Sequence, residues 1–305
     1  MSDRTSPHPP AHHPYAPIIA SAMRRPELWR AGLSIVGIIL IGLILTPVLF
    51  ALISHFAPNL APFQFGARGL AVGATPGGMF TILSGFLLVA FGTIWMARRL
   101  HARSLRDITG PGALMRAQFV TTLKWIVGFT ALIFFLPWDG DTEVVANLEP
   151  RTWLFWLPFA LLGLMIQVTA EELFFRGYLQ SQIAGSTGSY PLGLAASAVL
   201  FGLAHMNGSL EGVAAFFPVI WAMGFGLLAG DLTMRSGTIG PAIALHLVNN
   251  VSPILLAAQQ DMMSGFALFV QTEEPSVLLA DPKVMVFQTL LLITSWLVAR
   301  LAIRR

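Results

Sequence analysis

Two glutamates and two histidines in this sequence fall well inside long apolar stretches. They are Glu171, Glu172, His205 and His246. A charged side chain in the hydrocarbon core of a bilayer costs about 3 kcal/mol by insertion scales, so such a residue is a functional hypothesis by default. Glutamate and histidine also commonly act as general acids and bases. The residue types therefore predict proton-transfer chemistry inside a membrane.

The first of three short motifs is EELFFR, residues 171–176. Glu172 and Arg176 are i,i+4 neighbours with the acid on the favourable N-terminal side, so we expect them to form an ion pair. Adjacent helical residues point about 100° apart, so Glu171 lies on another face and is free to act as a base. A purely structural alternative is that both acids pair with Arg176 and hold the helix in place.

The other two motifs also place polar or aromatic side chains one helical turn apart. Phe201 and His205 share one face, and His246 and Asn250 present two hydrogen-bond donors side by side. Each could serve only to join helices through interhelical hydrogen bonds. Together with a glutamate, however, these groups are the parts needed to activate a water molecule and to stabilise an oxyanion.

The composition places these residues in lipid. Of 305 residues, 55% are hydrophobic and only 11% are charged, whereas soluble domains average about 25% charged residues. The chain has no cysteine, which excludes disulfides, a thiol nucleophile, an iron–sulfur cluster and Cys-ligated zinc. Any catalytic group must therefore be an oxygen or nitrogen base, or a hydroxyl.

Hydropathy predicts an all-α, polytopic membrane protein with about eight transmembrane helices. The predicted spans cover residues 31–54, 78–97, 117–137, 155–180, 191–210, 212–233, 237–258 and 284–303. We divide the chain into a disordered N-terminal tail over 1–30, N-terminal transmembrane helices over 31–150, a catalytic helical core over 151–258, and an outer loop with the last helix over 259–305. The tail histidines His8, His12 and His13 are interpreted as solvated side chains rather than a metal site.

The basic residues test this topology. With the N-terminus inside, all but Arg68, Arg151 and Lys283 of the 18 Lys and Arg residues fall on the cytoplasmic side, as the positive-inside rule requires. Both termini are then cytoplasmic, and we expect a multi-pass protein of the plasma membrane. The net charge of +3 is a topology signal, so the partners are the lipid bilayer and a membrane-bound substrate, with no nucleic acid.

The three motifs together resemble those of a known family. The CAAX prenyl protease and bacteriocin-processing (CPBP) family of intramembrane endopeptidases, also called type II CAAX protease or Abi, has the motifs E-E-x-x-x-R, F-x-x-x-H and H-x-x-x-N or -D. All three stand here in order, as Glu171-Glu172-x-x-x-Arg176, Phe201-x-x-x-His205 and His246-x-x-x-Asn250. The resemblance covers about residues 155–255, a third of the chain.

The resemblance implies a glutamic protease. Glu171 and His205 would polarise a water molecule that attacks the scissile carbonyl, while His246 and Asn250 would bind the oxyanion. Glu172, Arg176 and Phe201 would shape the site, and no cofactor would be needed. These residues include a possible His₂Glu zinc set in Glu171, His205 and His246, which makes a metalloendopeptidase the alternative. We prefer the metal-free version, because asparagine is a poor zinc ligand and no HExxH motif is present.

The substrate expected for such an enzyme is a membrane-anchored peptide or protein, with or without a lipid. Two other functions stay open. One is a non-proteolytic membrane protein of the same fold, such as a bacteriocin immunity factor or a scaffold, in which the polar residues serve packing. The other is a proton-coupled transporter that uses Glu171 and His205 as a relay.

Overall fold

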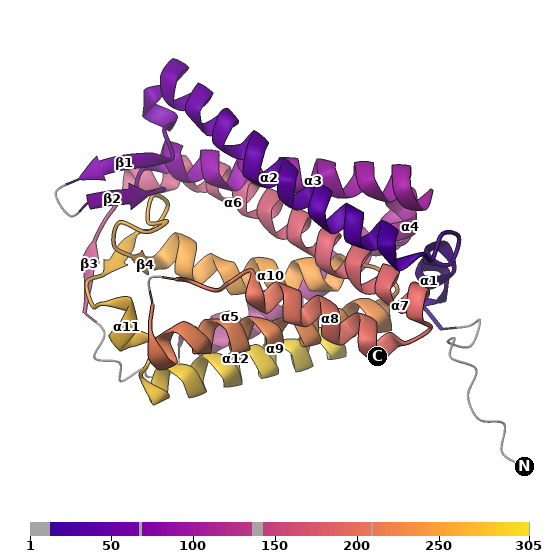
Figure 1. Cartoon of the computed structure of the whole chain (residues 1–305). Helices are drawn as coiled ribbons and strands as arrows, with labels where there is room; N and C mark the ends of the chain where they lie inside the picture. Colours follow the sequence, from indigo (N-terminus) through magenta and orange to yellow (C-terminus); the bar gives the residue numbers. More distant parts are fainter. Residues whose placement is uncertain (1–12, 67–68, 136–142, 209, 305) are drawn as a thin grey trace, which may run out of the picture.

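The fold is described from a computed structural model that covers residues 13–66, 69–135, 143–208 and 210–304. Helices make up most of it, as predicted. The long ones are α2 (Leu28–Phe56), α3 (Pro76–His101), α5 (Gly112–Phe134), α6 (Pro150–Glu172), α9 (Gly212–Ser236) and α12 (Pro282–Ala302). They run along a common direction in two layers, α2, α3 and α6 in one and the remaining long helices in the other (Figure 1).

Five helical units in the described residues are long and apolar enough to cross a membrane: α2, α3, the continuous helix Pro150–Thr187, α9 and α12. Two further apolar helices are shorter, α8 (Tyr190–Leu203) and α10 (Gly240–Val251) with its continuation η3 (Ser252–Leu256). Together with α5, these helices coincide with the eight predicted spans. The all-α, multi-pass class is confirmed, and the count of eight crossings stays a prediction.

The shorter helix α10 lies at the centre of the bundle. It packs against α5, α6, α9 and α12, and every residue from Gly240 to Leu247 is buried. Small residues allow similarly close packing elsewhere, for example where a Cβ on Gly226 of α9 would lie 2.8 Å from the Cα of Ala198 in α8. Such close approach of backbones is typical of helix pairs in membranes.

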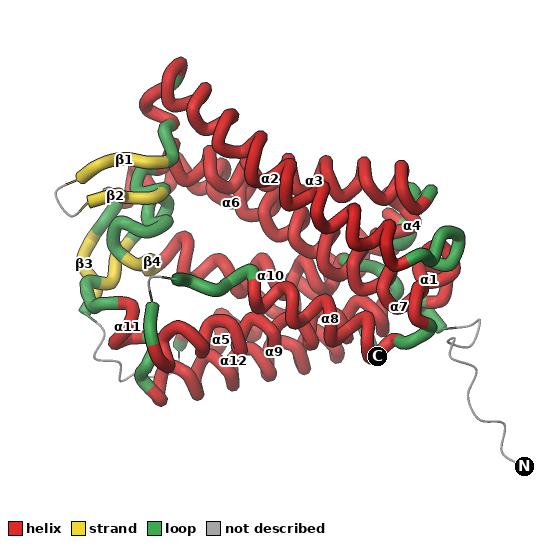
Figure 2. The backbone as a smooth tube through the Cα atoms, viewed as in Figure 1, coloured by secondary structure: helices red, strands yellow, loops and turns green. Residues whose placement is uncertain are grey.

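One end of the bundle carries short strands that the sequence analysis does not predict (Figure 2). A hairpin joins β1 (Phe63–Gly66) to β2 (Gly69–Val72). A second sheet has the order β3-β5-β4, with β3 (Val144–Ala146) antiparallel and β4 (Ala257–Gln259) parallel to β5 (Phe269–Gln271). The 3-10 turn η1 (Pro58–Leu60) and the short helix α11 (Pro275–Leu278) complete this end. These strands are three or four residues long, too short for a periodic hydrophobic pattern to reveal.

The opposite end holds three short helices, α1 (Ala16–Ala22), α4 (Leu105–Thr109) and α7 (Ser181–Thr187). The prediction of disorder over residues 1–30 is wrong here, because α1 packs on α4 and α7 and its Ile18 and Ile19 are 2% exposed. Membrane helix α2 also starts at Leu28, earlier than predicted. Residues 1–12, with His8 and His12, lie outside the described part.

Candidate active site

Glu171 and Glu172 lie where a long helix changes its winding. Helix α6 ends at Glu172 and continues without a break as the π-helical segment η2 (Leu173–Gln180) and then α7. Gly177 allows η2 to pass close to the backbone of α4, because a Cβ on this residue would lie only 2.7 Å from the carbonyl oxygen of Ile108. Helix α10 likewise changes from α-helical to π-helical winding: it ends at Val251, the residue after Asn250, and η3 follows. Short π-helical segments are frequent at functional sites.

Glu172 joins two of the motifs. Its Oε2 lies 3.3 Å from Nε of Arg176, the ion pair that the i,i+4 spacing predicts. Its Oε1 lies 2.7 Å from Nδ1 of His246 on α10. The side chains of Glu172 and Arg176 are fully buried, and that of His246 is 4% exposed. Because a carboxylate only accepts hydrogen bonds, Nδ1 of His246 is the donor. Glu172 thus fixes the tautomer and orientation of His246.

Aromatic rings enclose the buried guanidinium of Arg176. Its Cζ lies 4.2 Å from the ring centroid of Phe201 and 5.5 Å from that of Phe225. None of its three guanidinium nitrogens makes a hydrogen bond within the described residues. The positive charge is therefore stabilised by the ion pair with Glu172 and by the faces of these rings. Both rings also contact His246, with centroids 5.8 Å and 4.8 Å from the imidazole.

Glu171 is on another face of the helix, as the spacing predicts, and it keeps an exposed fraction of 12%. Its Oε1 accepts a hydrogen bond of 2.9 Å from Nε2 of Gln167. Its Oε2 has no hydrogen-bond partner in the described residues and lies 3.6 Å from Nε2 of His246. One oxygen of this carboxylate is therefore buried beside the imidazole without a hydrogen bond in the described residues.

Asn250 reaches the same cluster through Gln167. Its Nδ2 donates to Oε1 of Gln167 over 3.1 Å, and its Oδ1 accepts from Nδ2 of Asn249 over 3.3 Å. The structure therefore brings five predicted site residues into one connected network of α6, η2 and α10: Glu171, Glu172, Arg176, His246 and Asn250.

His205 does not lie where the sequence analysis expects it. The predicted span 191–210 is too long, because α8 ends at Leu203 and the chain turns at Ala204 and His205, just before the helix-breaking pair Asn207 and Gly208. His205 is exposed. Its ring stacks on Phe201 with centroids 4.6 Å apart, in agreement with the i,i+4 prediction. Within the described residues no hydrogen bond joins it to Glu171.

The bonding of His205 nevertheless suits a base. Its Nδ1 lies 2.8 Å from the carbonyl oxygen of Phe201. Since a carbonyl oxygen only accepts, Nδ1 carries the proton, and in the neutral ring Nε2 has a free lone pair. Phe201, which is 2% exposed, separates this ring from His246.

The zinc alternative needs a convergent donor set. Among the described residues, no group of three His, Asp or Glu side chains is placed to hold a metal ion. Glu171 and His246 approach each other, and the bond from Nδ1 of His246 to Glu172 would leave Nε2 of the imidazole for a metal ion. His205, the third member of the His₂Glu set, is exposed and stacks on Phe201, and no hydrogen bond joins it to Glu171 in the described residues.

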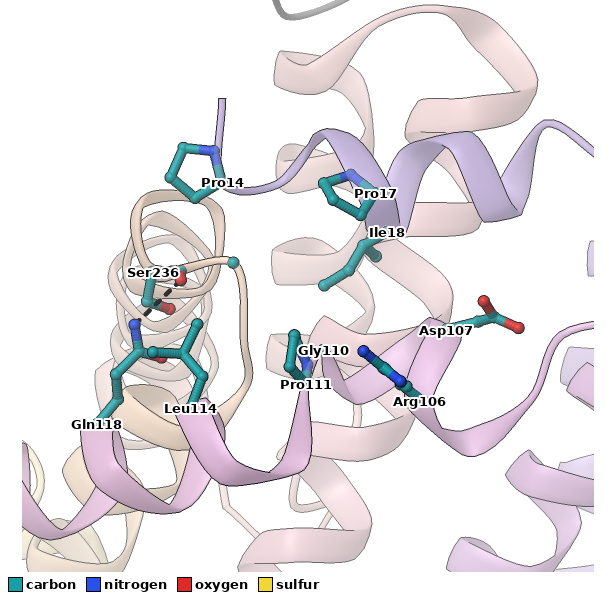
Figure 3. Close-up of a pocket in the computed structure, with 11 residues that line it drawn as sticks. Pro14, Pro17, Ile18, Arg106, Asp107, Gly110, Pro111, Leu114, Gln118 and Ser236 are labelled. Atoms are coloured by element: carbon teal, nitrogen blue, oxygen red, sulfur yellow. Dashed lines mark hydrogen bonds between the residues drawn. The ribbon is translucent and has the colours of Figure 1, made fainter. Parts of the chain in front are cut away.

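A separate pocket of about 530 Å³ opens at the end of the bundle that carries α1 and α4 (Figure 3). No residue of the three motifs lines it. Two of its polar side chains have partners within the chain: Gln118 donates to the carbonyl oxygen of Ser236, and Asp107 pairs with Arg24. We therefore place the candidate active site at the motif residues rather than in this pocket.

The sequence analysis misses three residues of the site. Gln167 bonds both Glu171 and Asn250, Asn249 bonds Asn250, and Phe225 stacks on His246. A usable signal exists for Gln167, because it precedes Glu171 by four residues and so shares its helix face. No spacing rule points to Phe225, which comes from a different helix.

Comparison with known proteins supports the motif assignment. Residues 152–252 match the family model described as type II CAAX prenyl endopeptidase Rce1-like. The matched stretch contains all three motifs, so the suspected relationship is confirmed for this part of the chain.

A relative from Bacillus subtilis (strain 168), the uncharacterized protein YyaK, is 27% identical over 185 residues. The match covers 58% of this chain and 61% of that protein. No solved structure matches the chain significantly. The helical fold describes a multi-pass membrane protein, and the family match concerns its residues 152–252. Over residues 152–252 the chain is similar to the Rce1-like type II CAAX prenyl endopeptidase family, and its match to the Bacillus subtilis relative spans less than two thirds of that protein.

Proposed function

We propose that the chain is an intramembrane glutamic endopeptidase, in which Glu171 and His205 activate a water molecule and His246 and Asn250 stabilise the oxyanion. One observation carries the proposal. The unpartnered Oε2 of Glu171 lies 3.6 Å from Nε2 of a buried imidazole. Asn250 is linked to the same carboxylate through Gln167. A base and two oxyanion donors thus meet inside an apolar bundle, where electrostatic stabilisation is strong.

The charge balance of the cluster assigns a proton. Glu171 and Glu172 contribute two negative charges and Arg176 one positive charge, so the buried network is neutral only if it binds one further proton. A neutral network costs least in a medium of low dielectric constant. The extra proton belongs on Nε2 of His246 or on Oε2 of Glu171, which are the two close atoms without another partner.

With that proton on His246, Glu171 can act as the base and His246 as an oxyanion donor, as we propose. Nδ1–H of His246 is already donated to Glu172, so only Nε2–H can reach an oxyanion. The imidazolium supplies this second donor, and Glu171 stays ionised and can accept a proton. Glu172 then acts as the buried counterion that holds the imidazolium in place.

The reaction needs one water molecule and no other reagent. Glu171 accepts a proton as the water oxygen bonds to the scissile carbonyl carbon, and the carbonyl oxygen takes up the negative charge beside His246 and Asn250. As the C–N bond breaks, the amine leaves with the proton from Glu171, and the carbonyl forms again as a carboxylic acid. His205 assists by accepting a hydrogen bond from the same water through its free Nε2.

His205 requires a movement on substrate binding. It is exposed and has no hydrogen bond to Glu171 within the described residues. Hydrogen bonds between catalytic groups are often long before substrate binds and shorten in the complex. We therefore place the substrate backbone between the segment after α8 and the face of α6 that carries Glu171.

The proposal includes orientation and substrate class. Basic residues lie in the elements at the α1 and α4 end of the bundle: Arg24 follows α1, Arg98 is near the end of α3, Arg106 is in α4, and Arg304 follows α12. The positive-inside rule then puts this end and both termini in the cytoplasm, in our proposal of the plasma membrane. The substrate is a membrane-anchored peptide, and a covalently attached lipid would be a second means of keeping it at the bilayer.

Reconstitution in vesicles tests this function. The purified protein is incubated with a library of lipidated and transmembrane peptides, with and without a strong chelator, and the products are identified by mass spectrometry. The proposal predicts cleavage that the chelator leaves unchanged and that Glu171→Ala abolishes. Loss of cleavage with the chelator would establish the metalloenzyme, and failure to cleave any peptide would favour the immunity or scaffold function.

A further inference from the structure

Among the described residues, Gln167 is the one side chain that bonds both to the proposed base and to a proposed oxyanion donor. It lies on α6, one turn before Glu171, and is 9% exposed. Its Nε2 donates to Glu171 over 2.9 Å, and its Oε1 accepts from Asn250 over 3.1 Å. Neither the family motifs nor the spacing arguments assign it a role.

The hydrogen bonds of this cluster form a chain with a single direction. An ionised carboxylate only accepts, so the amide of Gln167 must turn its nitrogen toward Glu171. Its oxygen then faces Asn250, which must donate through Nδ2. The oxygen of Asn250 in turn faces Asn249, which donates over 3.3 Å. The negative charge on Glu171 therefore determines the orientation of all three amides.

We propose that Gln167 is a positioning residue that sets which atoms Glu171 and Asn250 present to the substrate, an inference that rests on the proposed endopeptidase function. By occupying Oε1 of Glu171, it leaves Oε2, the oxygen beside His246, as the proton acceptor. By accepting one N–H of Asn250, it holds that amide with its nitrogen inward, and the second N–H is available for the oxyanion.

Without Gln167, the carboxylate of Glu171 and the amide of Asn250 would no longer be held in one orientation. The carboxylate could rotate and exchange its oxygens, and the amide of Asn250 could turn over to present its oxygen, which repels an oxyanion. Both changes act on the transition state more than on substrate binding, because the charge they affect develops during the reaction. The signature of the positioning role is therefore a loss in kcat with little change in KM.

The first experiment compares Gln167→Leu with Gln180→Leu in the reconstituted full chain. Gln180 is a matched control: it is on the same continuous helix, is 1% exposed, and its side chain donates to the carbonyl oxygen of Gly230, with no hydrogen bond to a motif residue in the described part of the chain. We expect Gln167→Leu to lower kcat by about 10² to 10³ with KM within about twofold, since removing one oxyanion-hole donor has this effect. Gln180→Leu should destabilise the fold to a similar extent and leave kcat within about twofold.

The second experiment uses Gln167→Glu and a pH profile. An ionised glutamate cannot donate to Glu171 and places a second negative charge beside it, whereas a protonated carboxyl group has both an O–H donor and a carbonyl acceptor, as the amide has. The ratio of variant to wild-type kcat should therefore rise by at least tenfold as the pH falls from 8 to 5. A residue that only fills space would give a ratio independent of pH.

The outcomes separate this proposal from the function on which it rests. If wild-type protein cleaves no peptide, the proposed function fails. If wild-type protein is active and Gln167→Leu keeps its kcat, or changes only KM, the positioning role is overturned. The same holds if Gln180→Leu reduces kcat as strongly, because the loss then reflects general destabilisation.

Discussion

Glu172 and Arg176 show why a buried ion pair can be placed in a membrane core at all. Both side chains are fully buried, and separating either from its partner would leave an unpaired charge. Glu172 is further stabilised by Nδ1 of His246, and Arg176 by the face of Phe201. Each charge therefore has two compensating contacts, and the pair also fixes the imidazole that we place beside the substrate.

Removal of the Arg176 charge should destabilise the protein strongly. Arg176→Met is expected to lower the free energy of unfolding in mixed detergent by about 3 kcal/mol, because Glu172 would remain buried without its cation. Arg235→Met is the control: it breaks the i,i+4 pair with Asp231, whose two side chains are 39% and 20% exposed, and should cost below about 1 kcal/mol.

A double variant separates charge from packing. Arg176→Met combined with Glu172→Gln should recover part of the lost stability, since no unpaired charge remains. Strictly additive losses in the double variant would contradict the view that charge compensation is the main contribution of Arg176.

Helix α1 is joined to α7 by the buried cation of Arg103, in addition to the apolar packing of Ile18 and Ile19. Arg103, which follows α3, is fully buried. Its guanidinium donates to Ser21 of α1 over 3.0 Å and to Ser181 and Gln182 of α7 over 2.8 Å and 3.0 Å. Burial lowers the pKa of Arg103 to about 10, so the side chain stays charged at neutral pH. It therefore connects α1 to the end of the long site-bearing helix.

Loss of this cation should release α1 and leave the site helices in place. For Arg103→Met we expect amide hydrogen exchange in residues 16–22 to accelerate by at least tenfold, with exchange in α10 unchanged. Arg106→Met, an exposed neighbour in α4, is the control and should leave α1 protected. Equal exchange of α1 in wild type and Arg103→Met would show that apolar packing of Ile18 and Ile19 suffices.

The sequence predicts the helices of the site and the contacts within one helix better than it predicts where helices end and how they contact each other. Apolar periodicity and length predict the long helices, and i,i+4 spacing predicts the pair of Glu172 with Arg176 and the stacking of His205 on Phe201. The contact of Glu172 with His246 depends on how α10 packs against α6, which no local pattern encodes. The strands are too short for a periodic pattern to predict, whereas Asn207 and Gly208 give a local signal for the early end of α8.

At the scale of the whole molecule, the two ends of the bundle differ in chemistry. The end with α1 and α4 carries most of the described basic residues, whereas the strand-bearing end has acidic ones such as Glu149, Asp261, Glu273 and Asp281. This asymmetry agrees with a fixed orientation across a membrane whose cytoplasmic side attracts Lys and Arg. The site network lies on α6 and α10 between the two ends.

Cysteine labelling tests the orientation directly, because the chain has no native cysteine. Ala113→Cys at the start of α5 and Thr272→Cys after β5 are exposed positions at opposite ends. In intact cells, a membrane-impermeant thiol reagent should label Thr272→Cys and should reach Ala113→Cys only after the membrane is permeabilised. The reverse pattern would invert the topology and move the proposed entry side of the substrate.

The central claim is that the carboxylate of Glu171 is the base for hydrolysis within the membrane. The most direct measurement is the single-turnover cleavage rate of Glu171→Gln, which keeps the size of the side chain and one oxygen that can accept from Gln167 but cannot accept the proton. We predict a rate at least about 10²-fold below wild type, with substrate binding and the free energy of unfolding nearly unchanged. A Glu171→Gln protein that cleaves at more than a tenth of the wild-type rate would contradict the account.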